Sequence, residues 1–366
     1  MSLNVLIASA NGYGNAGDDI CAVVSQMLVR ASGKHVKVKV TAPPYDDHLA
    51  KWSDVLILGG GGIIYDANKE NMENYLAYID HGLEYDKKTV GLGLGEQGIV
   101  TKAGEKRYKG AFNKMDLLTV RSTLDAKRLQ DFGVKTVEAT QDLGFSFDYT
   151  HYRAKAARRR ARKGEYKLIK RPRLGVVLSN QEHLVNDLKL AFSKEEKVNA
   201  LHFKNAFEKN IEHMAKSFDI TIITQSRDDL DMAEGYKRDY GVRVHTYRTE
   251  RDLHKLLKTY AKQDLIITQR FHGAVFSFMM GIPVIVLGYH GQKQYKLLHD
   301  MKLQSKLVMY HKPKELEKLL HDLTLNAKDL SRNVIQLNKT QYQFLLDTAK
   351  QNQEKLQTVL ADHFLD

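Results

Sequence analysis

Short apolar segments rich in β-branched residues recur along this chain, and helix-like segments separate them. Asp54–Leu58 is one such segment and Asp264–Thr268 is another. Polar residues or glycines bound them, which is typical of strands buried in a parallel sheet. The predicted strands are 5–8, 36–40, 54–58, 89–94, 117–120, 174–178, 220–224, 242–244, 264–268 and 284–287. Strands that alternate with helices in this way predict doubly wound α/β domains.

The chain is long enough for two such domains. It has 366 residues, of which 43% are hydrophobic, so each domain can build its own core. We expect two Rossmann-like, doubly wound domains that face each other across a cleft. The predicted boundaries are an N-terminal domain over 1–150, a basic linker or insertion over 151–173, a C-terminal domain over 174–330, and a C-terminal helix over 331–366 that could pack back across both domains.

The positive charge of the chain is concentrated in one segment. The formal net charge is +12, and residues 153–173 hold eleven Lys or Arg against a single acid, Glu165. Such a segment can be a solvated charged helix or linker. It can also bind an anionic membrane that bears a lipid-linked acceptor, or nucleic acid or another polyanion, of which nucleic acid is the less expected partner.

Composition also restricts the compartment and the metal chemistry. A single cysteine excludes an internal disulfide and a cysteine-based metal site, and it suits a reducing compartment. The fifteen histidines show no metal-ligand spacing supported by carboxylates, so we expect no metal. No signal-peptide pattern precedes the strand 5–8, and no apolar run reaches the roughly 18 residues of a membrane span. We therefore expect a cytoplasmic protein, with peripheral contact at the inner face of the membrane as an option.

An arginine and a histidine, Arg270 and His272, lie where a predicted strand meets the next helix, 273–280. In open α/β sheets ligands bind at this edge, and the helix N-terminus favours anions. A fixed cation beside a titratable imidazole suits an anionic substrate and proton transfer. Lys293 follows the strand 284–287 and approaches the same edge. The alternative is a buried helix-capping His with the Arg paired to a carboxylate.

Glycine-rich strand ends lie in the first half of the chain. Gly12–Asp19 formally matches G-x-G-x-x-G, but Asp18 and Asp19 would compete with a phosphate at the helix N-terminus. The loop is therefore a nicotinamide-cofactor site, a tight turn capped by an aspartate, or a loop whose Asn15 or Asp18 contacts a hydroxylated substrate. Gly59–Gly62 follows a buried strand, where such a run permits close approach of a ligand or of the other domain.

Three charged residues complete the set of candidates in this half. Asp66 is the nearest acid after the glycine run, and Arg121 ends the strand 117–120. Asp142 follows in the same half. Each of the last two can equally be an ordinary member of an ion pair.

Taken together, these motifs resemble the polysaccharide pyruvyl transferase family. The motifs, in order, are Gly14–Asp19, Gly59–Gly62 with Asp66, Val120–Ser122, and Arg270–Gly273 through Gly281–Val284 to Lys293, which span residues 4 to about 295. The resemblance implies a glycosyltransferase-B-like pair of Rossmann domains with the active site in the cleft. It also implies transfer of a pyruvyl group from phosphoenolpyruvate, with no other cofactor, onto two hydroxyls of a sugar as a ketal in cell-surface polysaccharide.

The resemblance assigns roles to these residues. His272 would be the general acid that protonates carbon-3 of phosphoenolpyruvate. The anionic groups would be held by Arg270 and Arg121, with Lys293 on the phosphate or carboxylate. The remaining substrate-binding candidates are Asn15, Asp18, Gly60, Gly61 and Asp66.

The chain departs from the family pattern in two places. The stretch Tyr289–Lys293 is one residue longer than the Tyr-Asp-Pro-Lys of many members, and the resemblance does not explain the basic segment 153–173. A nucleotide-sugar-dependent glycosyltransferase of the same architecture is the alternative enzyme, and a non-enzymatic polyanion-binding protein is the alternative outside catalysis.

Overall fold

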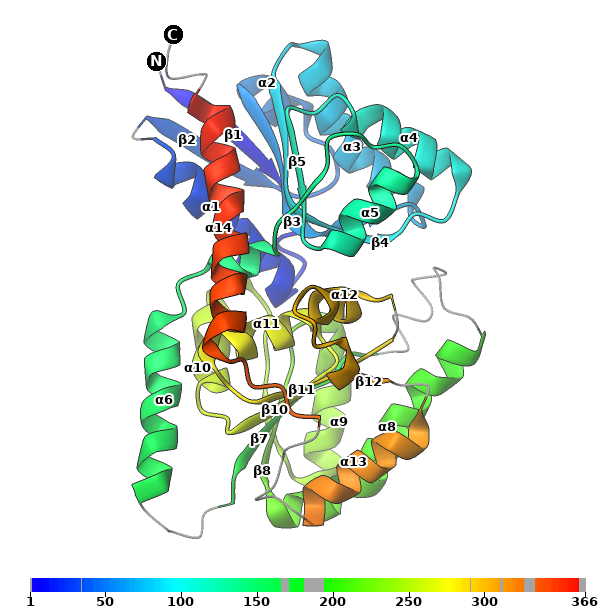
Figure 1. Cartoon of the computed structure of the whole chain (residues 1–366), viewed down its shortest axis with the longest axis vertical. Helices are drawn as coiled ribbons and strands as arrows, with labels where there is room; N and C mark the ends of the chain where they lie inside the picture. The colour runs from blue at the N-terminus through cyan, green and yellow to red at the C-terminus, as the bar shows by residue number, and fades with distance from the viewer. Residues whose placement is uncertain are drawn as a thin grey trace. The chain divides into compact units, whose positions relative to one another are not determined.

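The computed structural model contains two parallel sheets of six strands, each in its own compact unit (Figure 1). It describes residues 2–33, 35–165, 171–180, 194–289, 291–309, 312–325 and 333–361. Unit 1 comprises Met1–Tyr13, Gly17–Phe147 and Gln343–Asp366, and unit 2 comprises Gly14–Ala16 and Asp148–Tyr342. The prediction of two Rossmann-like, doubly wound domains is therefore confirmed.

Unit 1 has the strand order β2-β1-β3-β4-β5-β6. The strands are β1 (Leu3–Ala8), β2 (Val36–Thr41), β3 (Val55–Tyr65), β4 (Lys88–Gly98), β5 (Leu117–Val120) and β6 (Glu138–Ala139). The helices are α1 (Ala16–Ala31), α2 (Asp47–Trp52), α3 (Lys69–Glu84), α4 (Lys102–Phe112), α5 (Thr123–Asp131) and, from Gln343 onward, α14 (Lys339–Ala361). All strand pairs are parallel, so the strand ends that precede helices meet at one edge.

Unit 2 has the strand order β12-β11-β10-β7-β8-β9, again with all pairs parallel. Its strands are β7 (Arg173–Val177), β8 (Asp219–Ile223), β9 (Arg243–His245), β10 (Leu265–Thr268), β11 (Val284–Gly288) and β12 (Val308–Met309). Its helices are α6 (Thr150–Glu165), α8 (Lys194–Ser217), α9 (Leu230–Tyr240), α10 (Leu253–Tyr260), α11 (Phe271–Met280), α12 (Lys293–Asp300) and α13 (Pro313–Leu325).

The four-glycine run departs from its predicted place. Gly59–Gly62 does not follow the strand but lies inside β3, which continues to Tyr65 and pairs with β4 through a register shift after Gly61. Gly60 and Gly61 have positive φ values of 73° and 82°, which side chains other than glycine rarely adopt. A Cβ on Gly60 would lie 2.8 Å from Leu143 Cδ1, so the run permits close packing within unit 1.

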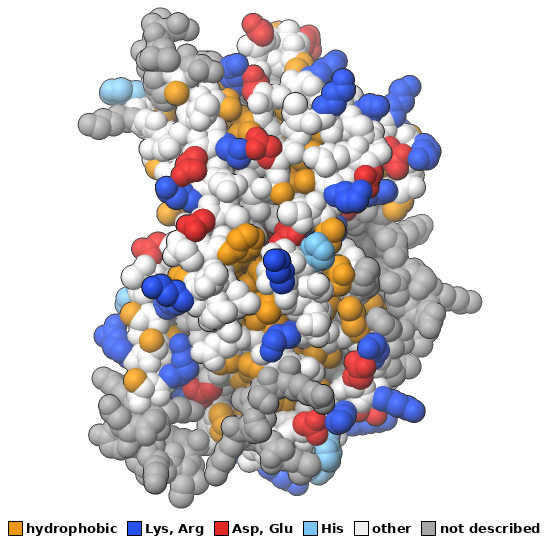
Figure 2. All heavy atoms as spheres, in the orientation of Figure 1, with side chains coloured by type: hydrophobic (Ala, Val, Ile, Leu, Met, Phe, Trp, Pro, Cys, Tyr) orange, Lys and Arg blue, Asp and Glu red, His pale blue; other side chains and the backbone are white. Residues whose placement is uncertain are grey.

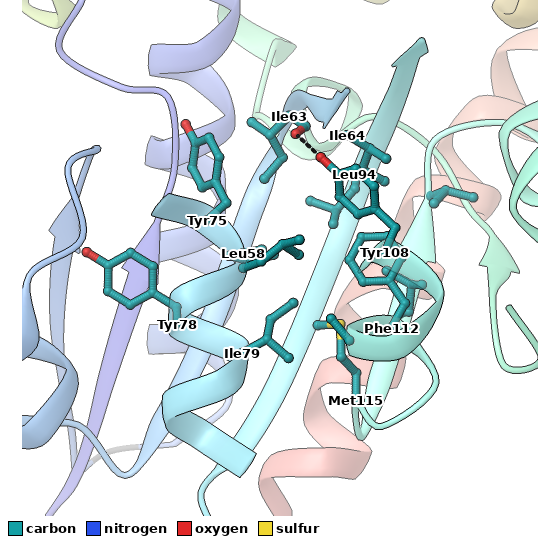
Figure 3. Close-up of a cluster of buried hydrophobic side chains, with 14 of the residues drawn as sticks. Leu58, Ile63, Ile64, Tyr75, Tyr78, Ile79, Leu94, Tyr108, Phe112 and Met115 are labelled. Atoms are coloured by element: carbon teal, nitrogen blue, oxygen red, sulfur yellow. Dashed lines mark hydrogen bonds between the residues drawn. The ribbon is translucent and has the colours of Figure 1, made fainter. Parts of the chain in front are cut away.

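A cluster of buried hydrophobic side chains holds the helices of unit 1 against its sheet. Tyr75, Ile79 and Phe112 pack from α3 and α4 onto strand residues such as Leu58 and Leu94, and all of these side chains are buried (Figure 3). Burial of aromatic and aliphatic side chains on this scale is the main source of stability for such a layer. This packing fixes the ends of β3 and the start of α3, where candidate site residues lie.

The C-terminal helix belongs largely to unit 1. Asn352 of α14 is fully buried, and its Oδ1 accepts hydrogen bonds from the hydroxyls of Thr119 and Thr140, each at 2.8 Å. Its Nδ2 donates to the carbonyl of Gln141 at 2.9 Å. Buried polar groups of this kind are satisfied only in one arrangement, so they fix the position of the helix on the sheet.

Candidate active site

Arg270 lies two residues after the end of β10 and is the residue that precedes the first turn of α11. Its Nη2 donates to Oδ1 of Asp229, a fully buried carboxylate whose Oδ1 also accepts from the backbone N–H of Asn180 at 3.0 Å. The Arg270 side chain is only 18% exposed. Within the described part of the chain, Arg270 Nε and Asp229 Oδ2 are buried without a hydrogen-bond partner. A guanidinium held in this way is a preorganised cation, and its partly exposed side chain can contact an anionic ligand.

His272 lies in the first turn of α11, two residues after Arg270, and it is half-buried. Its ring packs against Phe271 and Phe276, with centroid distances of 5.1 and 6.0 Å. The aromatic neighbours restrict the orientation of the imidazole. The helix N-terminus places a partial positive charge beside it, which favours an anionic ligand at the same point.

Two buried glutamines adjoin these residues, and the sequence reasoning did not find them. Gln269 accepts a hydrogen bond from the N–H of Ser179 at 2.8 Å, and its own carbonyl accepts from Nε2 of Gln294 at 2.7 Å. The Nε2 of Gln269 and the Oε1 of Gln294 are buried and have no hydrogen-bond partner among the described residues. Because such atoms cost about 1–3 kcal/mol each when unsatisfied, they point to a ligand or water at this edge. The only sequence signal was their position next to Arg270 and Lys293.

Lys293 begins α12 just after β11, and it is half-buried. In unit 2 the structure therefore brings Arg270, His272 and Lys293 to the same edge of one sheet, since β10 and β11 are parallel neighbours. The alternative interpretation of Arg270, in which it pairs with a carboxylate, is also observed, because Arg270 pairs with Asp229. The pairing leaves the Arg270 side chain 18% exposed, so the two interpretations do not conflict.

Unit 1 has a buried cation of its own. Arg121 follows β5 and is 4% exposed, with its Nη1 3.5 Å from Oδ2 of the fully buried Asp142. Its guanidinium lies over Gly95, where a Cβ would approach within 2.2 Å. Burial, and next the charge of Asp142, raise the pKa of the Cys21 thiol well above its usual value, and Asp18 acts in the same direction. Arg121, Asp142 and Asp18 thus gather around Cys21 on α1.

The two aspartates in the first turn of α1 have different contacts. Asp19 is buried and its Oδ1 accepts from the N–H of Gly12 at 2.9 Å, so Asp19 stabilises the turn. Asp18 is half-buried, and its Oδ1 would lie 3.1 Å from a Cβ on Gly61. Asn15 belongs instead to unit 2, where it forms an antiparallel bridge with Ser226. The structure places Asp18, Gly60 and Gly61 together in unit 1, to which Asn15 does not belong.

Asp66 has mainly structural contacts. Its carboxylate accepts from the N–H groups of Val100 and Thr101 at 2.9 and 2.8 Å and from the Thr101 hydroxyl at 2.6 Å. Gly104 of α4 packs closely against it. This arrangement fixes the start of α4, and a role of Asp66 in binding substrate stays a prediction.

Residues 153–165 of the basic segment belong to α6 in unit 2, and two of the arginines there turn toward the protein. Arg153 lies 3.7 Å from the ring centroid of Tyr342, and Arg159 pairs with Asp264 at 3.3 Å. Lys155 and Arg158 are exposed. Residues 166–170 of the segment lie outside the described residues. Basic side chains on the visible face are scattered among acidic ones and do not form one patch (Figure 2). In the described ranges, no helix has the length and apolar character needed to cross a membrane.

The fold and the two sheet edges define a protein of two Rossmann-like domains with ligand-binding candidates after the strands of each. Solved structures with this fold include three UDP-N-acetylglucosamine 2-epimerases, one described as putative. The Listeria monocytogenes structure, the putative one, has a TM-score of 0.55 at 10% identity and covers 100% of this chain and 97% of its own. The Methanocaldococcus jannaschii structure, in complex with UDP-GlcNAc and UDP, has a TM-score of 0.55 at 11% identity, with 95% and 99% covered. The Neisseria meningitidis structure, bound to UDP-GlcNAc, has a TM-score of 0.55 at 9% identity, with 97% and 99% covered.

At such low identity these similarities establish the fold alone. A search of curated protein sequences gave no significant match. The sequence model of the polysaccharide pyruvyl transferase family matches residues 15–291, which is more than half of the chain. The protein belongs to the polysaccharide pyruvyl transferase family.

Proposed function

We propose that this protein transfers the pyruvyl group of phosphoenolpyruvate to two hydroxyls of a saccharide acceptor and forms a pyruvate ketal in the synthesis of a cell-surface polysaccharide. The observation that carries the proposal is the Arg270–His272 arrangement at the N-terminus of α11, together with the family of the chain. Phosphoenolpyruvate has a carboxylate and a phosphate, and both groups suit a guanidinium beside a helix N-terminus.

The edge of unit 2 offers more than one contact for such a donor. Arg270 is held by Asp229, and its side chain is 18% exposed. Gln269 keeps an unused amide donor nearby, and Lys293 adds a second cation on the next strand–helix junction. Amide and guanidinium donors fit carboxylate or phosphate oxygens, so these three residues would orient the donor.

The chemistry needs one proton donor and two oxygen nucleophiles. His272, in its protonated form, would give a proton to carbon-3, which becomes a methyl group while carbon-2 gains oxocarbenium character. One sugar hydroxyl then bonds to carbon-2 and loses its proton. Phosphate leaves with the electrons of its bond to carbon-2, and the second hydroxyl bonds there and loses its proton to close the ring. A positioned general acid contributes about 10²–10⁴-fold to such a step.

Donor binding can be tested by thermal unfolding in phosphate-free buffer with phosphoenolpyruvate. A ligand at 100 times its Kd stabilises the folded protein by about 2.7 kcal/mol, which gives a measurable rise in Tm. Arg270→Lys keeps a positive charge opposite Asp229 but removes the planar fork, and it should weaken binding about tenfold or more. The matched control is Arg238→Lys, an exposed arginine of α9 that pairs with Asp239.

Three outcomes separate the candidate donors. Stabilisation by phosphoenolpyruvate in wild type and Arg238→Lys, reduced in Arg270→Lys, supports the proposal. Equal stabilisation in all three proteins would remove Arg270 from the donor site. Stabilisation by UDP-GlcNAc with no response to phosphoenolpyruvate would favour a nucleotide-sugar-dependent glycosyltransferase, the alternative with the same fold.

The acceptor is proposed to be assembled on a lipid carrier, which would bring the protein to the inner face of the membrane. The exposed cations Lys155 and Arg158 on α6 support this contact. Each basic residue near an anionic surface contributes about 1 kcal/mol of attraction, so the described cations alone provide weak, salt-sensitive contact.

A further inference from the structure

Gln294 joins the two strand–helix junctions that carry the cations of unit 2. It is the second residue of α12, directly after Lys293, and it is 5% exposed. Its Nε2 donates to the backbone carbonyl of Gln269 at 2.7 Å, and Gln269 directly precedes Arg270. Helices α11 and α12, which begin at these junctions, contact each other (Figure 1). One buried hydrogen bond therefore links the neighbour of Lys293 to the neighbour of Arg270.

The Arg270 junction is held by contacts of its own. The hydroxyl of Thr268 accepts from the N–H of Arg270 at 3.0 Å and donates to the carbonyl of Arg270 at 2.9 Å. Gly273 of α11 packs on the same hydroxyl, because a Cβ there would lie 2.0 Å from Thr268 Oγ1. Asp229 holds the guanidinium. The Gln269 carbonyl, which lies between Thr268 and Arg270, is therefore a fixed anchor for a partner on another element.

The start of α12, where Lys293 lies, has no side-chain cap among the described residues. The Oε1 of Gln292, the residue before the helix, accepts instead from the N–H of Tyr289 at 3.3 Å. The stretch from Tyr289 to Lys293 is also one residue longer than the family pattern, so sequence position alone does not place Lys293. An uncapped helix start is less stable than a capped one. The bond from Gln294 ties this start to the end of the neighbouring strand.

We propose that Gln294 is a positioning residue, which holds Lys293 at the sheet edge beside Arg270 so that both cations can contact one phosphoenolpyruvate. The inference rests on the proposed function, in which Arg270 and Lys293 bind the donor. Phosphoenolpyruvate has two anionic groups, so the placement of the two cations decides whether one molecule can use both. A lysine on an anchored helix start also loses less conformational entropy on binding than one on a loose start.

The test removes the hydrogen bond and keeps the packing. Gln294→Met retains a long, buried side chain but cannot donate to the Gln269 carbonyl. The matched control is Gln263→Met, because Gln263 is 3% exposed and its Nε2 donates to the carbonyl of Thr259 at 2.9 Å. Gln263 precedes β10, so it lies at the opposite edge of the same sheet. Both variants lose one buried hydrogen bond to a carbonyl, so a general loss of stability appears in both.

The first readout needs no ligand. The N–H of Lys296 donates to the carbonyl of Gln292 at 2.9 Å in the first turn of α12. Hydrogen exchange at this amide should be at least about threefold faster in Gln294→Met than in wild type, and unchanged in Gln263→Met. Unchanged exchange in Gln294→Met would overturn the positioning role.

The second readout is the Kd of phosphoenolpyruvate, measured by isothermal titration calorimetry in phosphate-free buffer. The proteins are wild type, Gln294→Met, Lys293→Met, the double variant and Gln263→Met. Gln294→Met should weaken binding about three- to tenfold when Lys293 is present and by less than about twofold in the Lys293→Met background, while Gln263→Met binds like wild type. A merely structural role would weaken binding equally in both backgrounds, and that result would overturn the proposal.

Failure of the proposed donor has a different signature. No binding of phosphoenolpyruvate to wild type would contradict the proposed function, and hydrogen exchange alone would then decide the role of Gln294. Faster exchange in Gln294→Met, without a change in Gln263→Met, would still support the anchoring of α12.

Discussion

Replacement of Asn352 by Ala tests how the C-terminal helix holds the sheet edge of unit 1. The change removes three hydrogen bonds, two accepted from Thr119 and Thr140 and one donated to Gln141. The two hydroxyls keep alternative acceptors, the carbonyls of Gly91 and Val120, each at 3.3 Å. The Gln141 carbonyl loses the amide, and an unsatisfied buried group costs about 1–3 kcal/mol.

The longer hydrogen bonds left to the Thr119 and Thr140 hydroxyls add a smaller loss. We therefore expect the free energy of unfolding of unit 1 to fall by about 2–4 kcal/mol. Trp52 is the only tryptophan and lies in unit 1, so its fluorescence in a urea titration reports the unfolding of that unit. The control is Gln351→Ala, a half-exposed neighbour on the same helix, which should change stability by less than about 0.5 kcal/mol. A loss in Asn352→Ala no larger than in the control would refute the anchoring role.

Three further outcomes are expected. Gly60→Ala should destabilise unit 1 by about 2–4 kcal/mol, because the alanine would have a positive φ and its Cβ would lie 2.8 Å from Leu143 Cδ1. An unchanged urea unfolding curve would contradict this packing. Burial lowers the pKa of His245 to about 4, so below about pH 6.5 His245 is protonated in the unfolded chain but stays neutral in the folded chain. The free energy of unfolding should therefore be highest above about pH 6.5 and should fall by up to about 3 kcal/mol toward pH 4. Unfolding followed by circular dichroism should show a shallower fall in His245→Gln. Lys155→Glu with Arg158→Glu should reduce sedimentation with phosphatidylserine vesicles at low salt, and undiminished sedimentation would exclude α6 as the membrane contact.

The strand and helix pattern was predictable because it depends on local periodicity. Asp264–Thr268 and Val284–Leu287 match β10 and β11 closely, since a short β-branched run between polar residues has few other structures open to it. The continuation of β3 through Gly59–Gly62 was not predictable, because glycines usually end a strand. Only the pairing with β4 and the packing of Leu143 against Gly60 keep this run within the sheet.

The candidate site was predictable where the motif is contiguous. Arg270 and His272 lie at a strand–helix junction, as the sequence indicated. Asp229, which holds Arg270, is distant in the sequence and gives no local signal, because the parallel topology alone brings it to the same edge.

The measurement that tests pyruvyl transfer most directly is an incubation of the protein with phosphoenolpyruvate and a panel of methyl hexopyranosides in D₂O, followed by NMR. Protonation of carbon-3 during transfer would give a ketal methyl group that contains one deuterium, with release of one phosphate per ketal. We predict this product for wild type and a loss of about 10²-fold or more in rate for His272→Gln. Ketal formation at an undiminished rate in His272→Gln, or consumption of UDP-GlcNAc in place of phosphoenolpyruvate, would contradict the account.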